Sequence, residues 1–110
     1  MRTYLPKEPQ KEDFELSSVL YALSDPIRLD IVRQLASVDS LACGNFQIEK
    51  PKSSLSHHFR VLRESGVVAT RRDGTTLLNR LRRHDLESTF PGLLKAVLGV
   101  LRKATRSNRS

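Results

Sequence analysis

A helical pattern passes directly into a hairpin pattern just past the middle of the chain. Leu55, Phe59 and Leu62 recur at i, i+4 and i+7, and this spacing predicts a helix over residues 52–65 with one apolar face. Gly66 follows at the position where helices often end in a left-handed residue. The helix is therefore expected to lie on a core and to present its opposite face to solvent.

The hairpin pattern consists of two strand-like runs, residues 67–72 and 75–81, on either side of Asp73-Gly74. Asp-Gly between two such runs is a strong signal for a two-residue turn. Arg71 and Arg72 lie next to this turn, so the tip of the predicted hairpin is basic.

Helical spacing recurs on both sides of this central run. An apolar stripe starts after Asp13, and a second helix is predicted from Pro26 to Ser37 because Ser24 or Asp25 supplies an N-cap just before the proline. A short helix after residue 85 and a longer one past residue 91 complete the pattern. Residues 38–51 predict only a short helix and a turn.

These elements predict a mainly α (α+β) fold, a winged helix-turn-helix with about five or six helices and one β-hairpin wing. The 110 residues suffice for one core but not for two. We expect a flexible N-terminal arm over residues 1–12, a DNA-binding and dimerisation domain over 13–104, and a basic tail over 105–110.

The composition favours nucleic acid as the partner. The formal net charge is +7, which attracts a polyanion, and an anionic membrane surface is the rival to nucleic acid. Four Phe, two Tyr and no Trp argue against a single-strand binder that stacks bases on aromatic rings. No apolar run approaches the ~20 residues that cross a bilayer, and the N-terminus lacks the apolar core of a secretory signal. With only one cysteine, Cys43, we expect a cytoplasmic protein without a membrane partner.

The solvent face of the predicted helix suits a DNA groove. Its side chains are short hydroxyls, an imidazole and guanidinium groups, from Ser53, Ser56, His57, Arg60 and Arg63. Short polar side chains allow close approach to base edges, and an arginine can bind guanine O6 and N7 together. Lys52 adds charge at the helix N-terminus, which favours phosphate. The alternative is an ordinary solvated face of an amphipathic helix.

In the hairpin, adjacent arginines on one strand point to opposite faces. Arg72, next to the turn, is therefore the better candidate for a phosphate or minor-groove contact. The alternative is that both arginines protect an exposed edge strand from aggregation.

Three runs carry a family resemblance: D-P-I-R-L-D-I-V-R-Q-L from Asp25, S-S-L-S-H-H-F-R-V-L-R-E-S-G-V-V from Ser53, and R-R-D-G-T from Arg71. Together they resemble the ArsR/SmtB family of bacterial transcription repressors, over residues 14 to 100. The resemblance implies a homodimeric winged-helix repressor that binds an inverted-repeat operator and releases it when an inducer binds. It also implies major-groove contacts from the helix and a wing contact from Arg72, with His58 on the flank, either bonded to phosphate or packed. The residues predicted to contact DNA are Lys52, Ser53, Ser54, Ser56, His57, His58, Arg60, Arg71, Arg72 and Thr75.

Two apolar stripes predict self-association. They are Leu16/Leu20/Leu23 near the N-terminus and Leu94/Val97/Leu98/Leu101 near the C-terminus. Together they exceed what a domain this small easily hides, so a homodimer through the N- and C-terminal helices is expected. The alternative is that both stripes pack in one monomer core.

The chain departs from the metal-binding pattern of the resembled family. Where a C-x-C pair would stand, only Cys43 is present, and near the last helix only His84, Asp85 and Glu87 occur. A tetrahedral site needs three or four ligands, so we predict no metal and no other cofactor. Cys43 retains three interpretations: a buried small side chain, a redox or electrophile sensor, or a metal ligand shared across a dimer.

No glycine-rich phosphate loop, nucleophile-and-base pair or paired carboxylates stand out, so we expect no enzyme. The alternative function is a winged-helix protein-interaction or RNA-binding module without operator specificity. A protein-docking helix would present an exposed Leu or aromatic anchor where this chain has Ser53, Ser56, His57 and Arg60.

Overall fold

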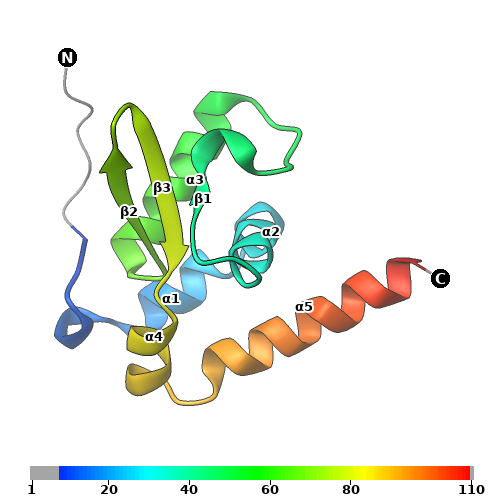
Figure 1. Cartoon of the computed structure of the whole chain (residues 1–110). Helices are drawn as coiled ribbons and strands as arrows, with labels where there is room; N and C mark the ends of the chain where they lie inside the picture. The colour runs from blue at the N-terminus through cyan, green and yellow to red at the C-terminus, as the bar shows by residue number, and fades with distance from the viewer. Residues whose placement is uncertain (1–7, 110) are drawn as a thin grey trace.

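A computed structural model describes the backbone of residues 8–109 and the side chains of residues 8–103 (Figure 1). Its elements are η1 (Lys11–Asp13), α1 (Leu16–Ala22), α2 (Pro26–Leu35), β1 (Leu41–Ala42), η2 (Cys43–Asn45), α3 (Lys52–Ser65), β2 (Val68–Asp73), β3 (Thr76–Leu81), α4 (Arg83–Thr89) and α5 (Leu93–Arg109). The predicted fold class, helices with a β-hairpin wing, is confirmed. Residues 1–7 of the predicted arm lie outside the described residues.

The sheet has three antiparallel strands in the order β1-β3-β2. β1 was not predicted; its Leu41 pairs with Asn79 and its Ala42 with Leu78. The sequence predicts a short helix or a turn for residues 41 and 42. Two residues carry no periodicity, so only the presence of β3 beside them shows that they form a strand.

The hairpin turn is shifted by one residue from its prediction. Asp73 pairs with Thr76, so the two turn residues are Gly74 and Thr75 rather than Asp73 and Gly74. Gly74 has φ +64°. This placement puts the glycine first in the loop, where a type II′ turn needs a positive φ and no Cβ.

The start of α2 follows the prediction closely. Asp25 is its N-cap, and Oδ2 accepts hydrogen bonds from the backbone N–H groups of Ile27 (2.8 Å) and Arg28 (3.0 Å). Pro26 occupies the first turn, where a missing N–H costs nothing. A side-chain cap of this kind typically stabilises a helix by about 1 kcal/mol.

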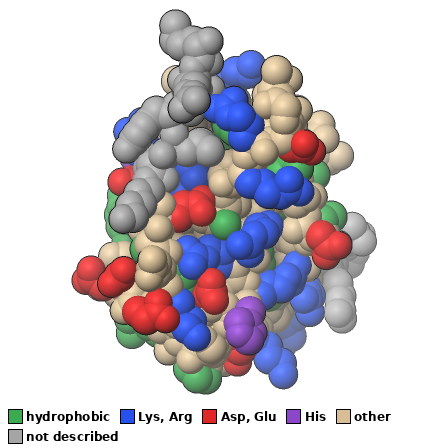
Figure 2. Space-filling model, turned by 60° about the vertical axis from the view of Figure 1, so that its left-hand side comes forward, with side chains coloured by type: hydrophobic (Ala, Val, Ile, Leu, Met, Phe, Trp, Pro, Cys, Tyr) green, Lys and Arg blue, Asp and Glu red, His purple; other side chains and the backbone are tan. Residues whose placement is uncertain are grey.

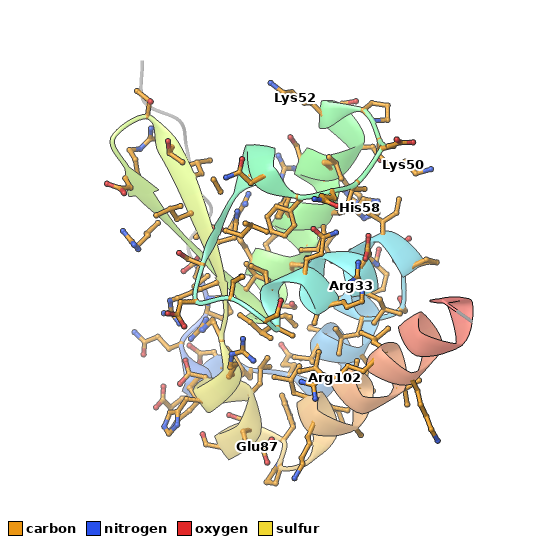
Figure 3. The ribbon with its side chains drawn as sticks, turned by 45° about the vertical axis from the view of Figure 1, so that its right-hand side comes forward. Arg33, Lys50, Lys52, His58, Glu87 and Arg102 are labelled. Carbon is orange, nitrogen blue, oxygen red and sulfur yellow. The ribbon has the colours of Figure 1, made fainter. Side chains whose placement is uncertain are left out.

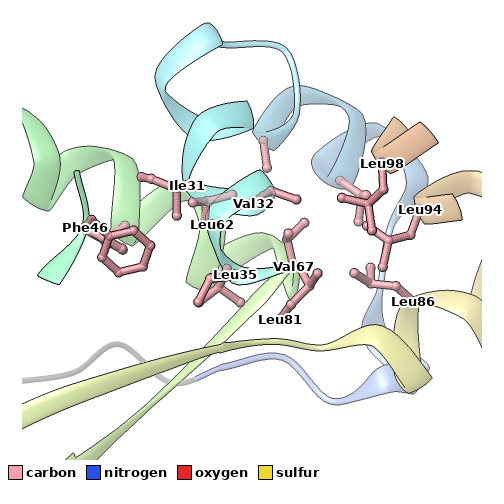
Figure 4. Packing of buried hydrophobic residues seen from close by; sticks show 14 residues of the cluster. Ile31, Val32, Leu35, Phe46, Leu62, Val67, Leu81, Leu86, Leu94 and Leu98 are labelled. Atoms are coloured by element: carbon pink, nitrogen blue, oxygen red, sulfur yellow. The ribbon is translucent and has the colours of Figure 1, made fainter. Parts of the chain in front are cut away.

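The core lies where α2, α3 and the sheet meet, and it continues toward α4 and α5 (Figure 4). Ile31, Val32 and Leu35 from α2 pack with Phe59 and Leu62 from α3. Phe59 and Leu62 are buried as the helical spacing predicted, and Leu55 is half-buried against the same cluster. One face of α3 is thereby fixed on the core, which decides the face that remains free.

The junction of α3 and β2 is held by the N-terminal segment. Gly66 ends α3 at φ +91°, as predicted, and the ring of Phe14 lies against it. Glu8 accepts a hydrogen bond from the backbone N–H of Thr70 (2.6 Å), on the outer edge of β2. The guanidinium of Arg82 donates to the carbonyl of Pro9 (2.7 Å) and lies over the Phe14 ring. Glu8 and Pro9, at the end of the arm predicted over residues 1–12, therefore contact β2 and Arg82.

Candidate nucleic-acid interface

The free face of α3 carries the polar side chains that the sequence singled out. Ser53, Ser56, His57 and Arg60 are all exposed. No side chain caps the N-terminus of α3, so its first N–H groups and its helix dipole are available to an anion. Lys52 is exposed at this end of the helix (Figure 3). This surface therefore combines exposed hydrogen-bonding side chains with a helix N-terminus that no side chain caps.

Two other residues of α3 do not lie on this face. His58 is 9% exposed, and its Nδ1 lies 3.1 Å from Nη1 of Arg28. Figure 3 places His58 between α3 and α2. Arg63, also considered for the free face, is 9% exposed, and its Nε has no hydrogen-bond partner among the described residues. The prediction that His58 contacts DNA is corrected, because its ring is buried against Arg28. Of the two alternatives given for this residue, the structure shows the packed one.

Ser54 is half-buried, so it is a weaker candidate than its exposed neighbours. The helical repeat explains why His57 is exposed while His58 is buried. His57 and His58 are successive residues and differ by about 100° around the helix axis, which turns one to solvent and the other toward α2.

The wing residues Arg71, Arg72 and Thr75 are exposed. Thr70 pairs with Asn79 and Arg72 with Leu77, so Arg72 shares the hairpin face of the buried Asn79. Arg71 points to the opposite face, as the alternation predicts. The exposed side chain of Arg80 lies on that same face. Arg80 was not among the predicted residues. Figure 2 shows Lys and Arg side chains gathered over the side of the molecule on which the hairpin lies.

The wing tip and the N-terminal end of α3 lie at the same end of the molecule (Figure 1). The polar helix face and the basic hairpin are therefore presented together, although about ten residues separate Arg60 from Arg71 in the chain. A duplex contacted by one is within reach of the other.

The comparisons with known proteins agree with this arrangement. A helix-turn-helix domain family matches residues 23–71. The uncharacterized HTH-type transcriptional regulator YceK of Bacillus subtilis is 36% identical over 91 residues, which cover 80% of this chain and 91% of YceK. The arsenical resistance operon repressor of Staphylococcus xylosus is 37% identical over 76 residues, covering 66% of this chain and 71% of the repressor. The crystal structure of the transcriptional repressor BigR from Xylella fastidiosa superposes with a TM-score of 0.57 at 32% identity, covering 68% of this chain and 85% of BigR.

The chain belongs to the ArsR/SmtB family. Members of this family are winged helix-turn-helix transcriptional regulators, so the protein is a DNA-binding regulator and not an enzyme. No helix in the described part of the chain has both the length and the apolar character needed to cross a membrane.

Cys43 of this ArsR/SmtB regulator is half-buried beside the sheet. Its Sγ accepts a hydrogen bond from Nδ2 of Asn79 (3.2 Å), and Asn79 is completely buried. Oδ1 of Asn79 in turn accepts from the hydroxyl of Thr70 (2.7 Å). The sulfur therefore belongs to a polar layer beneath the wing, and a change at the sulfur would act directly on β3.

Burial lowers the pKa of the Arg63 guanidinium. Within residues 8–103, no group of three or more His, Cys, Asp or Glu side chains is placed to hold a metal ion.

The apolar stripes of the terminal helices divide between the core and the surface. Leu94 and Leu98 of α5 are each 7% exposed and pack within the chain, so part of the predicted dimer stripe belongs to the monomer core. Four other large apolar side chains on these helices point outward: Leu16 (48% exposed), Leu20 (47%) and Tyr21 (59%) on α1, and Val100 (67%) on α5. In Figures 1 and 3, α1 and the first part of α5 lie side by side.

Proposed function

We propose that this regulator is a homodimeric repressor that binds an inverted-repeat operator in the cytoplasm, with one α3 in the major groove of each half-site. The observation that carries the proposal is the free face of α3, which presents Ser53, Ser56, His57 and Arg60 and has no acidic side chain before Glu64, near the C-terminal end of the helix. The N-terminal part of this face, with its hydroxyl, imidazole and guanidinium groups, can approach both base edges and phosphates. The repressor role is supported by the names of the S. xylosus relative and of BigR.

The predicted DNA contacts divide into base contacts and phosphate contacts in this proposal. Ser53, Ser56, His57 and Arg60 read base edges, while Lys52 binds phosphate at the helix N-terminus. Arg72 and Thr75 of the wing contact phosphate or the minor groove, and Arg71 adds long-range attraction. The side chain of Ser54 is half-buried, so Ser54 contributes its backbone N–H at the N-terminus of α3 rather than a side-chain contact to a base.

Dimerisation is supported by the outward apolar side chains of α1 and α5. Leu16, Leu20, Tyr21 and Val100 are too large and too exposed to be explained by packing within the chain. A twofold axis through these helices would present two α3 helices on one side of a duplex. Their separation would match one helical turn, about 34 Å, so the operator should be an inverted repeat.

A thiol-dependent response at Cys43 is proposed as a separate feature of the same regulator. The half-buried sulfur leaves a path for a small oxidant, and Gly44 leaves open space next to it. The sulfur bonds to β3 of the wing through Asn79, so oxidation would alter the surface that contacts DNA.

The experiment that tests the function is selection of bound duplexes from a random pool at near-physiological salt. We expect an enriched inverted repeat whose half-sites lie about 10 base pairs apart, centre to centre. A variant with both His57→Ala and Arg60→Ala is the matched control, since it keeps the basic wing. That variant should bind duplexes without enrichment. No enrichment by the parent protein, or equal retention of a random RNA pool, would contradict the proposal.

A further inference from the structure

Arg28 joins three helices at one buried point. Its side chain is 4% exposed and donates hydrogen bonds to the carbonyl groups of Ala22 (2.8 Å) and Tyr21 (3.1 Å) at the end of α1. Its Nη1 also lies 3.1 Å from Nδ1 of His58 on α3. Arg28 and His58 therefore add one polar link between α1 and α3, two helices that also pack directly against each other.

The chemistry of the two side chains fixes the protonation state of His58 in this arrangement. An arginine has only donors, so Nδ1 of His58 must be the acceptor, and the neutral ring carries its proton on Nε2. A protonated ring would turn an N–H toward the Arg28 N–H groups and set two positive charges side by side. The other acceptor at hand is Oδ2 of Asp25, 3.7 Å from Nδ1, which already caps α2.

We propose that His58 is a pH-sensitive positioning residue for α3: the neutral ring holds α3 against the end of α1, and protonation releases it. The inference rests on the proposed function, because it joins the DNA-reading helix to a helix of the proposed dimer interface. Tyr21, exposed on α1, lies against the Arg28 cation at 5.1 Å from its ring centre. Release of α3 would change the distance between the two reading helices of a dimer, so operator affinity should fall on acidification.

The groups that face His58 support this direction. They are Asp25 and Arg28 from α2 and His57 from α3, while α1 contributes Tyr21 through Arg28. Burial lowers the pKa of His58, the Asp25 carboxylate opposes this, and the charges of Arg28 and His57 lower the pKa further. The folded pKa therefore lies below the ordinary value of 6.5. The unfolded chain then binds more protons, so the stability from this contact is present above pH 6.5 and is lost as pH falls through the folded pKa.

The contribution of His57 must be separated from that of His58, because His57 is exposed on the proposed DNA face. A comparison of two proteins that both keep His57 leaves only the difference made by His58.

The test compares operator affinity from about pH 7.5 to about pH 5.0 at constant ionic strength. The parent protein is compared with His58→Asn, and both keep His57. In His58→Asn, the amide oxygen can replace Nδ1 as the acceptor for Arg28 but does not titrate. We expect the parent protein to lose at least about threefold more specific affinity over this range than His58→Asn does.

A second measurement needs neither DNA nor a variant. In ¹⁵N-histidine NMR spectra of the parent protein, His58 should carry its proton on Nε2 at about pH 7.5 and titrate with a pKa below the ordinary value. A ring protonated on Nδ1 at that pH, or equal pH dependence of operator affinity in the parent protein and in His58→Asn, would overturn the inference. Absence of any preferred duplex at neutral pH would instead overturn the proposed function. The NMR measurement uses no DNA, so it tests the His58 contact independently of that function.

Discussion

At the scale of single residues, the proposed DNA-binding surface depends on the side of α3 on which each side chain lies. His57 is exposed, whereas His58 is buried beside Arg28. Arg60 is exposed, whereas Arg63 is buried. The sequence contains two histidines and two arginines on this helix, but only one of each is free to meet DNA.

Arg60→Ala should weaken operator binding by about 1–3 kcal/mol, because a bidentate contact to guanine contributes that much discrimination. The measurement is the affinity for operator and for random duplex under the same salt conditions. Arg72→Ala is the matched control, because loss of a phosphate contact should flatten the salt dependence by about one unit of slope and leave discrimination intact. Unchanged discrimination in Arg60→Ala would remove this residue from base reading.

Cys43→Ser should bind operator as the parent does and should no longer release it on treatment with peroxide. Serine is close in size to cysteine and can still accept the Asn79 hydrogen bond, so the wing should keep its structure. Operator release is followed by fluorescence anisotropy before and after oxidation, with thermal unfolding as the control for structure. Release of the serine variant by peroxide would show that another group responds.

At the scale of elements, the end of α3 and the start of β2 meet in a place that admits only glycine. Gly66 has φ +91°, and a Cβ at this position would overlap the ring of Phe14. Phe14 is itself held by Arg82, whose guanidinium lies 4.8 Å from the ring centre. The docked N-terminal segment therefore contributes to the angle between the recognition helix and the wing.

Gly66→Ala should destabilise the protein by at least about 1 kcal/mol more than Gly92→Ala. Both glycines have a positive φ, so both variants carry the cost of a left-handed alanine, about 1–2 kcal/mol. Only Gly66 also meets a neighbouring side chain, because nothing lies within 4 Å of a Cβ at Gly92. Chemical denaturation measures the difference, and adding Phe14→Ala should reduce it. Equal losses of unfolding free energy in the two variants would show that the Phe14 ring moves aside without a measurable cost.

At the scale of the whole molecule, the protein presents two surfaces of different character. One end carries the α3 N-terminus and the wing tip, which are polar and basic. The outward sides of α1 and α5 carry Leu16, Leu20, Tyr21 and Val100. In the proposed dimer the first surface meets DNA and the second meets another copy, so symmetry relates the two recognition helices.

Val100→Glu should convert the dimer to a monomer and lower operator affinity by about tenfold or more, since only one half-site is then held at a time. Val100 is 67% exposed within the chain, so the monomer should still fold. Sedimentation gives the mass and circular dichroism the fold. Ser88→Glu, an exposed change of similar charge on α4, should leave the dimer intact. A monomeric parent protein would contradict the dimer itself.

Short-range patterns in the sequence were enough to place several elements. The bounds of α3, the Asp25 cap of α2 and the left-handed Gly66 followed from residues within one or two helical turns of each other. The free face of α3 followed as well, because the apolar side chains at Leu55, Phe59 and Leu62 fix the side that packs. Local chemistry and periodicity act over these distances, so the printed sequence carries them.

Other features were decided only by the tertiary structure. β1 exists because β3 lies beside it, and the register of the hairpin places Thr75 rather than Asp73 beside Gly74 in the turn. The burial of His58 depends on Arg28, 30 positions earlier in the chain, and the contacts of Glu8 and Pro9 depend on Thr70 and Arg82. Each of these is a contact between groups far apart in sequence, and its energy arises only when folding brings both partners together.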